Sequence, residues 1–384
     1  MIPAARLAWL QLSREPLRLL VAIAGVTFAV ILVFMQLGFE DALFTSAVAI
    51  HTRLRGDLVL LNPRSAYMAT MQTFSRRRLY QARSHPGVAA VTPVYMRLAP
   101  WKNPATGESR EIFVVGLDPD ADVLDIPAIA AQRRLIRLTD VALFDEASRP
   151  EFGPVVAAVG AGRPVSAEVL GHRLSVRGLF RLGSSFGIDG TLVTSEVSFR
   201  RLFPGWRPGL VNLGLISLRP GADPETVRTE IAAALPSDVA VLTHAGYIAR
   251  EQAYWAENTP IGYAFTFGVV MGWFVGAIIV YQILFSDVTA HLAGYATLKA
   301  MGYTNAYLFA VVLMEALLLA VLGYLPGLAV CLELYRVTEA ATRLPMTIGL
   351  TRAVQVLVLT AVMCGVSGVV AMRKVRTADP AEIF

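Results

Sequence analysis

Ser185 stands where a hydrolase would carry its nucleophile, in the stretch GSSFG at residues 183–187. In enzymes with the G-x-S-x-G pattern, a strand precedes the serine and a helix follows it, which exposes the hydroxyl at a strained turn. Here the next residues, IDGTLVT, predict another strand. A Gly/Ser-rich hairpin loop therefore explains the stretch better than an esterase site, and a membrane-anchored hydrolase that uses Ser185 stays open as an alternative.

Other patterns that carry chemistry are absent from the sequence. There is no G-x-x-x-x-G-K-[ST] phosphate-binding loop and no Gly-Lys pair, so we do not expect the chain to hydrolyse ATP. No H-E-x-x-H stretch occurs and the five histidines are scattered, so no zinc site is predicted. The net charge of +5 is mild, and no dense Lys/Arg stripe indicates nucleic acid. We therefore predict no catalytic residue, no metal, no cofactor bound by this chain and no nucleic-acid partner.

The composition indicates a membrane protein. Hydrophobic residues make up 55% of the 384, charged residues only 16%, and the mean hydropathy is +0.54. The apolar residues gather in runs long enough to cross a hydrocarbon core at about 1.5 Å per residue. Three runs contain no charged residue, and the fourth is interrupted only by Glu315. The runs predict four transmembrane helices, at residues 18–39, 260–285, 304–332 and 352–372.

The segments around the spans predict the membrane topology of the chain. Four spans place both termini on one side, and the Lys and Arg residues near the spans favour the cytoplasm for that side. On that side lie Arg6, Arg14, Arg18, Lys299, Arg373, Lys374 and Arg376, against Arg336, Arg343 and Arg352 on the other. A retained first span is favoured over a cleaved signal peptide, because its apolar run is longer than a signal core. The predicted segments are a cytoplasmic interfacial amphipathic segment at 1–17, a periplasmic domain at 40–258, a cytoplasmic connection at 286–303, a short periplasmic loop at 333–351 and a cytoplasmic tail at 373–384.

The large segment at 40–258 has the pattern of an α+β domain. Alternation and β-branched content predict strands at DLVLL, VAAVTPVYMRLAPW, REIFVVGL, HRLSVRGLFRL, TLVTSE and VNLGLISLRP. The stretch DPETVRTEIAAAL predicts a helix with Asp223 as its N-cap and Pro224 at its first position. Because Cys331 and Cys364 both fall inside spans, no disulfide is available to this domain. Its length suits one domain or two packed lobes.

Two features inside the spans indicate helix contacts. Gly268, Gly272 and Gly276 recur every four residues and line one face of the second span, where another helix backbone can approach closely. This predicts a packing interface, either within the chain or between two copies. A carboxylate inside a membrane is costly, so Glu315 predicts gating or a polar contact with another helix. The alternative is that the third span begins later and Glu315 lies near the headgroups.

The connection at 286–303 predicts a short helix between the second and third spans. At helical spacing it carries one apolar face, formed by Val288, Leu292, Tyr295 and Leu298. A helix parallel to the membrane would expose this face to the groove of a cytoplasmic partner, and the alternative is an interfacial loop that rests on lipid. The candidate coupling residues are Asp287, His291, Leu292, Tyr295, Leu298, Lys299 and Gly302.

The order of one span, a large external domain and three further spans resembles the FtsX/MacB-type permeases of ABC exporters. LKAMGYTNAYL at 298–308 resembles the coupling helix of that family, and HPGVAAVTPVY at 85–95 is similar to a strand of its external domain. GHRLSVRGLFRL at 171–182 and ADPAEIF at 378–384 are similar to two further patterns of the family. The resemblance covers essentially the whole chain. TAHLAGYATLKAMGYTNAYL at 289–308 looks closest to the cyanobacterial DevC-like subgroup, whose relatives help to export envelope glycolipids.

The resemblance implies a homodimeric permease of the bacterial inner membrane, surrounded by membrane lipids, with ATP and Mg²⁺ bound by a separate cytoplasmic ABC ATPase subunit. It implies mechanotransmission, in which the motion of the ATPase passes through 287–302 to the periplasmic domain. That domain would act with a periplasmic adaptor (a membrane fusion protein) and a TolC-like outer-membrane channel to export a lipid or glycolipid-like substrate. The alternative is FtsX-like activation of a periplasmic peptidoglycan hydrolase. Many members carry an Arg-Glu pair in the coupling helix where this chain has His291 and Leu292, so we expect its partner contact to differ.

Overall fold

The computed structural model describes residues 4–377, with side chains through residue 372. These residues divide into two compact units. The helical unit contains the described parts of residues 1–41, 260–340 and 346–384, and the α+β unit contains residues 42–259 and 341–345. Of the predicted tail, only the backbone of 373–377 is described, and ADPAEIF lies outside the described residues.

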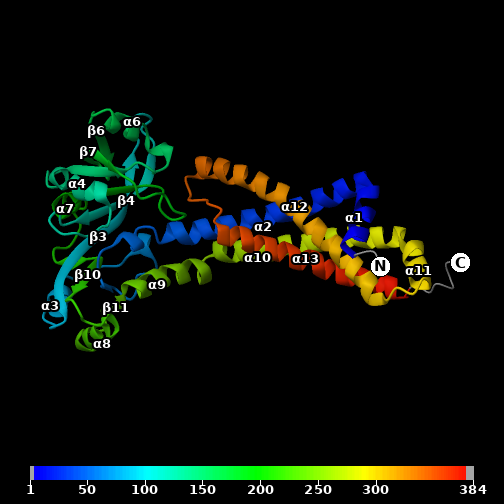
Figure 1. Ribbon diagram of the computed structural model, residues 1–384. Helices are drawn as coiled ribbons and strands as arrows, with labels where there is room; N and C mark the ends of the chain where they lie inside the picture. Colours follow the sequence, from blue (N-terminus) through cyan, green and yellow to red (C-terminus); the bar gives the residue numbers. More distant parts are fainter. Residues whose placement is uncertain (1–3, 378–384) are drawn as a thin grey trace. The chain divides into compact units, whose positions relative to one another are not determined.

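The helical unit confirms the predicted class of α-helical membrane protein. Within the described chain, four helices are long and apolar enough to cross a membrane, at Pro16–Ala47, Pro260–Ala290, Asn305–Thr342 and Leu350–Met372. They are α2 (Pro16–Ala47), α10 (Pro260–Ala290), α12 (Asn305–Thr342) and α13 (Leu350–Thr377). Two short helices, α1 (Ala4–Arg14) and α11 (Leu292–Ala300), lie at the same end of the helical unit (Figure 1).

Helices α2 and α12 pack closely through small residues. A Cβ added at Gly323 of α12 would come within 2.5 Å of Val26, and one added at Gly327 would come within 2.7 Å of Val30. Both valines belong to α2, so the two glycines let the backbones approach where side chains would hold them apart. Thr27 uses this proximity, since its hydroxyl donates to the Gly323 carbonyl at 3.0 Å.

The connection between α12 and α13 is shorter than the loop predicted at 333–351. Helix α12 continues to Thr342, and α13 already begins at Leu350. The helix extends past its apolar run because hydrogen bonding needs no apolar side chains, and Glu333 and Arg336 form an i,i+3 ion pair of 2.6 Å on its surface. Arg343, whose φ is 60°, follows the end of the helix.

The α+β unit, whose residues are all described, contains a nine-stranded sheet in the order β11-β1-β10-β3-β4-β8-β5-β7-β6. Its strands are β1 (Leu58–Leu61), β3 (Val88–Lys102), β4 (Ser109–Leu117), β5 (Val141–Asp145), β6 (Val165–Val169), β7 (His172–Phe180), β8 (Thr191–Ser195), β10 (Leu213–Leu218) and β11 (Ala240–Thr243). Strands β2 (Phe74–Ser75) and β9 (Leu210–Val211) form a separate pair. The predicted strands are therefore present.

The long strand β3 belongs to both parts of the sheet. Residues 88–94 pair with β10, and residues 95–102 pair with β4. Trp101 and Lys102 also pair with β6, so that β3, β4, β8, β5, β7 and β6 close into a six-stranded ring. The segment is thus one compact unit whose two sheet parts share a strand (Figure 1).

Short helices connect the strands of this unit. They are η1 (His51–Arg53), η2 (Met68–Thr70), α3 (Arg77–Arg83), α4 (Pro127–Ala131), α5 (Arg133–Ile136), η3 (Pro150–Phe152), α6 (Val155–Gly160), α7 (Glu196–Leu202), α8 (Pro224–Ala234) and α9 (His244–Glu257). The predicted cap of α8 is confirmed, since Asp223 Oδ2 accepts from the Thr226 N–H at 2.8 Å and Pro224 occupies the first position. The core includes Trp101, whose indole N–H donates to the Phe152 carbonyl at 3.1 Å.

Candidate functional site

Ser185 lies in the loop between β7 and β8 and is buried. A strand follows it, as predicted, and its hydroxyl accepts hydrogen bonds from the backbone N–H groups of Gly187 at 3.3 Å and Ile188 at 3.1 Å. These bonds stabilise a turn and give no sign of an activated nucleophile. The predicted hairpin is wrong, because β5 lies between β7 and β8 in the sheet. Among the residues described, no group of three or more His, Cys, Asp or Glu side chains has an arrangement that could hold a metal ion.

The predicted coupling segment forms the end of α10 and the whole of α11. Helix α10 continues to Ala290, and the chain turns at His291 before α11 begins at Leu292. Gly302 follows α11 with a φ of 91°, a conformation that glycine adopts without steric cost, and α12 starts at Asn305. The segment is therefore a helical bend between two long helices rather than an extended loop.

The expectation that the apolar face of this segment is exposed is wrong. Val288 is fully buried and Tyr295 is only 1% exposed. Both belong to a core cluster that contains Ala8 of α1, Leu308, Val311 and Val312 of α12, and Met372 of α13, with Leu298 packed against it. The face is apolar because the chain's own helices cover it, and residues so far apart in sequence give no local signal of this contact.

The exposed face of α11 is formed by the residues between the buried ones. These residues are small or flexible, and they are Ala293, Gly294, Thr297, Ala300 and, just beyond the helix, Met301. Met301 is 63% exposed, although it is the largest apolar side chain of this set. Exposed methionine suits a surface that adapts to a partner. Met301 lies outside the apolar face that contains Tyr295. This apolar side chain on the polar side of the segment was a signal in the sequence that our prediction did not use.

Polar side chains from α1, α2, α10 and α11 gather beside the bend. His291 Nδ1 lies 3.5 Å from Asp287 Oδ1, and the Tyr295 hydroxyl donates to Gln11 Oε1 of α1 at 3.5 Å. Arg18, near the start of α2, pairs with Glu15 at 2.7 Å and also interacts electrostatically with Asp287. Burial raises the pKa of Tyr295, which keeps its hydroxyl available as a donor. The segment is therefore held to α1 by polar contacts as well as by packing.

Glu315 is fully buried in α12, which begins at Asn305. Its carboxyl interacts with that of Asp287 of α10, both electrostatically and through a side-chain hydrogen bond. Glu315 thus makes a polar contact with another helix of the chain.

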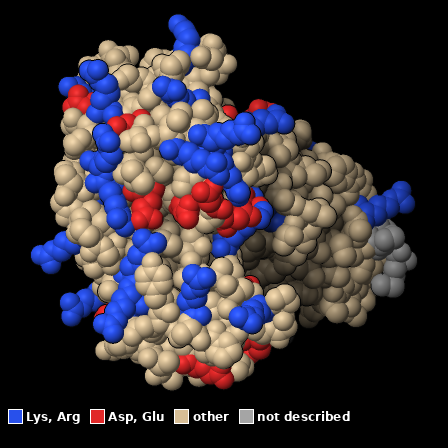
Figure 2. Space-filling model, turned by 90° about the vertical axis from the view of Figure 1, so that its left-hand side faces the viewer, with Lys and Arg blue, Asp and Glu red and all other residues tan. Residues whose placement is uncertain are grey.

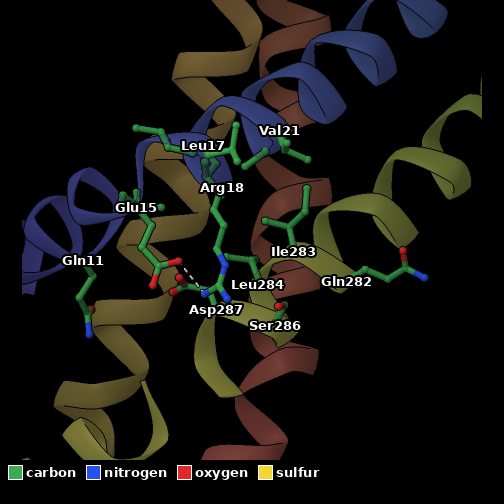
Figure 3. A pocket seen from close by; sticks show the side chains of 14 residues that line it. Gln11, Glu15, Leu17, Arg18, Val21, Gln282, Ile283, Leu284, Ser286 and Asp287 are labelled. Carbon is green, nitrogen blue, oxygen red and sulfur yellow. Dashed lines mark ion pairs between the residues drawn. The ribbon is translucent and has the colours of Figure 1, made fainter. Parts of the chain in front are cut away.

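A cavity of about 340 Å³ opens next to this cluster (Figure 3). Its walls are mainly apolar and come from the end of α1, the start of α2, the end of α10 and one residue of α12, Leu319. Glu15, Arg18 and Asp287 are its charged residues. The size and the few converging polar groups are typical of a ligand pocket.

The glycine stripe of α10 packs within the chain. A Cβ added at Gly268 would come within 2.5 Å of Gln36, and one added at Gly276 would come within 2.6 Å of Ala29. Gly272 is less crowded, with Leu32 at 3.5 Å. These partners lie on α2, and Met363 of α13 also lies within 2.5 Å of a Cβ added at Gly276, so the stripe packs against helices of the chain itself.

The α+β unit contains a buried ionisable pair that sequence reasoning missed. His51 follows α2, and Glu251 lies in α9, the helix that precedes α10. Glu251 accepts hydrogen bonds from the Met68 N–H at 3.0 Å and from the Trp255 indole N–H at 3.1 Å. The pair thus connects the two points at which the chain enters and leaves this unit.

The surface of the α+β unit carries many charged residues. Lys and Arg side chains outnumber Asp and Glu side chains on the face that Figure 2 shows. Several are paired, as in the ion pair of 3.0 Å between Arg78 and Asp238. The net basic character of this face favours an acidic contact surface on a partner.

Two family models match this chain. The model of the MacB-like periplasmic core domain matches residues 19–234, and the model of the FtsX-like permease C-terminal region matches residues 266–380. The first match covers more than half of the chain and contains most of the α+β unit. The second contains α11, α12 and α13 and nearly all of α10. Among curated proteins, no match was found.

Two solved structures are similar to the α+β unit. The periplasmic region of MacB from Actinobacillus actinomycetemcomitans is 9% identical, with a TM-score of 0.34, over 51% of this chain and 91% of that chain. The extracellular domain of the noncanonic ABC-type transporter YknZ from Gram-positive bacteria is 10% identical, with a TM-score of 0.32, over 49% of this chain and 99% of that chain. Neither match says what this chain binds. From the two family models and the four apolar helices, we conclude that the chain belongs to the FtsX/MacB family of ABC-type permeases.

Proposed function

We propose that this chain is the permease subunit of a tripartite ABC exporter. A separate cytoplasmic ATPase subunit binds ATP and Mg²⁺, and its motion passes through α11 to the helical unit and the periplasmic α+β unit. With a periplasmic adaptor and a TolC-like channel, this motion drives export of a lipid or glycolipid-like envelope substrate. Membership of the permease family and the lack of a phosphate-binding loop support this division of labour.

The observation that carries the proposal is the two-sided character of α11. One face is fixed to α1, α12 and α13 through Tyr295 and its cluster, and the opposite face is exposed. A partner that presses on the exposed face moves α10 and α12 together with α11, because the buried face leaves no soft layer between them. ATP binding has to favour one arrangement of the helices by several kcal/mol, and a rigid contact can transmit such a bias.

The matched variants Met301→Glu and Val337→Glu test this contact. Both side chains are similarly exposed, at 63% and 64%, but Val337 lies near the other end of α12. We expect Met301→Glu to weaken copurification of the ATPase subunit and its stimulation by the permease roughly tenfold, about 1.4 kcal/mol of contact energy. Val337→Glu should leave both unchanged. If the two variants copurify with and stimulate the ATPase subunit equally, α11 is not part of the ATPase contact.

The proposal also requires that α11 faces the cytoplasm, with both termini on that side. A Thr297→Cys variant can be labelled with a membrane-impermeant maleimide, because Thr297 is exposed and both native cysteines are buried. We expect labelling in inside-out vesicles and none in intact spheroplasts. The reverse pattern would contradict the proposed orientation.

The exposed apolar face of α10 supports a homodimer. Tyr263, Phe267, Phe274 and Ile278 are all exposed on this helix, on the side away from the glycine stripe. A Phe274→Cys variant should form an intermolecular disulfide in membranes if two copies meet here. Val358→Cys, on an exposed position of α13, is the control and should remain monomeric.

Gentle purification from the native membrane distinguishes export from hydrolase activation. An ATPase together with an adaptor and copurifying lipid supports the exporter. An ATPase together with a peptidoglycan hydrolase supports the alternative function.

A further inference from the structure

The cavity beside the bend lies at the membrane-facing surface of the helical unit. Leu17 and Val21 of α2 line one side, and Ile283 and Leu284 of α10 line the other. Leu17 and Val21 are themselves exposed, so the cavity communicates with the surface that contacts lipid. It lies at the start of α2 and the end of α10.

Three charged side chains converge at this cavity. In Figure 3, Glu15, Arg18 and Asp287 point toward one another below the apolar walls. Arg18 pairs with Glu15, yet both side chains remain about half exposed, at 52% and 42%. The Oδ2 atom of Asp287 is buried, and the Asp287 carboxyl also interacts with that of Glu315 through a side-chain hydrogen bond. The site therefore offers one cationic donor and two anionic acceptors.

We infer that this cavity binds a phospholipid whose headgroup carries a primary amine, such as phosphatidylethanolamine. Its ammonium group donates to Asp287 and Glu15, and its phosphate accepts from the Arg18 guanidinium. One acyl chain lies between the leucine, valine and isoleucine side chains of α2 and α10. The lipid is a resident component of the helical unit and is distinct from any exported cargo.

The charges of the site select this headgroup among membrane phospholipids. Phosphatidylglycerol has the phosphate but no cation, so it leaves two carboxylates facing an anion. Phosphatidylcholine has a cation without N–H groups and cannot donate to the carboxylates of Asp287 and Glu15. Only the primary ammonium satisfies the acceptors and the donor together. A cavity of about 340 Å³ accommodates part of one lipid, namely the headgroup and the first section of a chain.

Native mass spectrometry of the purified, delipidated full-length protein tests this inference. Dioleoyl phosphatidylethanolamine, phosphatidylglycerol and phosphatidylcholine are titrated separately. We expect one phosphatidylethanolamine to bind at least tenfold more tightly than either of the other lipids. Asp287→Asn should reduce that preference to within twofold, because it removes one of the two carboxylates that accept from the ammonium group. Equal binding of the three lipids to the unaltered protein overturns the inference.

A matched pair of variants locates the bound lipid. Val21→Trp fills the cavity, whereas Val358→Trp places the same ring on the lipid-facing side of α13, and the two valines are 57% and 54% exposed. We expect Val21→Trp to abolish the tight phosphatidylethanolamine site and Val358→Trp to retain it, with both proteins monodisperse. If Val21→Trp still binds phosphatidylethanolamine tightly, the inference is overturned, because the lipid then binds elsewhere on the protein.

The acyl chain is tested separately with glycerophosphoethanolamine, which has the same headgroup and no chains. It should not displace the lipid at equal concentration, and displacement would show that the apolar walls play no part. All of these measurements use the permease alone. Their outcome is therefore independent of whether an ATPase or an adaptor binds this chain.

Discussion

His51 Nε2 lies 3.4 Å from Glu251 Oε2, and both side chains are buried in the α+β unit. The His51 ring also packs against Tyr247, with ring centroids 4.5 Å apart. His51 belongs to the segment that follows α2, and Glu251 belongs to the helix that leads into α10. The pair therefore links the segment that follows α2 to α9, the helix that precedes α10.

Removing Glu251 should destabilise this connection. Glu251→Ala leaves the Met68 N–H and the Trp255 indole N–H without their acceptor, and we expect a loss of about 2–3 kcal/mol in the free energy of unfolding. Thermal unfolding of the purified protein measures the change. Glu251→Gln, which keeps an acceptor oxygen, should recover part of the loss. Glu257→Ala, at an exposed position of the same helix, is the control and should have no effect.

Tyr295 should behave as a core residue. Tyr295→Ala removes a buried aromatic ring, so we expect the helical unit to lose about 3 kcal/mol or more of stability in detergent. Tyr295→Phe keeps the ring and loses only a long hydrogen bond of 3.5 Å to Gln11, so its thermal midpoint should stay close to that of the unaltered protein. A thermal midpoint for Tyr295→Ala equal to that of Tyr295→Phe would show that the ring is not packed.

The glycines of α10 give a sharper comparison, because they differ in the space around them. Gly276→Ala places a Cβ 2.5 Å from Met363 Sδ and 2.6 Å from Ala29 Cβ, and we expect it to cost about 1–3 kcal/mol. Gly272→Ala meets its nearest atom at 3.5 Å, and the better helix propensity of alanine should keep its effect within about 1 kcal/mol of zero. Thermal stability in one detergent measures both. An equal loss for the two variants would contradict the close approach of α2 at Gly276.

Glu315 should tolerate replacement of its carboxyl by an amide. The buried carboxyl interacts with a second carboxyl, Asp287. Glu315→Gln keeps the shape and removes the contact between two acidic groups, so we expect a thermal midpoint equal to or above that of the unaltered protein at pH 8. Glu333→Gln, on the exposed surface of the same helix, should change nothing. A clear loss in Glu315→Gln alone would show that the fold needs the carboxyl group.

The sequence predicts the spans and strands of this protein well, because their signals are local. Long apolar runs locate α2, α10, α12 and α13, and the cap at Asp223 locates the start of α8. The ends of the spans are less well predicted, since a helix such as α12 continues to Thr342 after its apolar run ends.

Contacts between distant segments could not be predicted in this way. The periodicity around Tyr295 shows that one face of α11 is apolar, but it does not show that Ala8 and Leu308 cover that face. The glycine stripe likewise predicts a close helix without naming α2. The order of β8, β5 and β7 depends on pairings remote in sequence, which is why a hairpin was expected there. The cavity is formed by four helices and has no linear pattern at all.

Strand β3 gives the α+β unit an unusual mechanical property. Its residues 88–94 belong to the open part of the sheet, and its residues 95–102 belong to the closed ring, with no hinge residue between them. A displacement of β10 therefore acts on the same strand that pairs with β4 and β6. We expect the open part of the sheet and the closed ring to move together when a partner displaces either one.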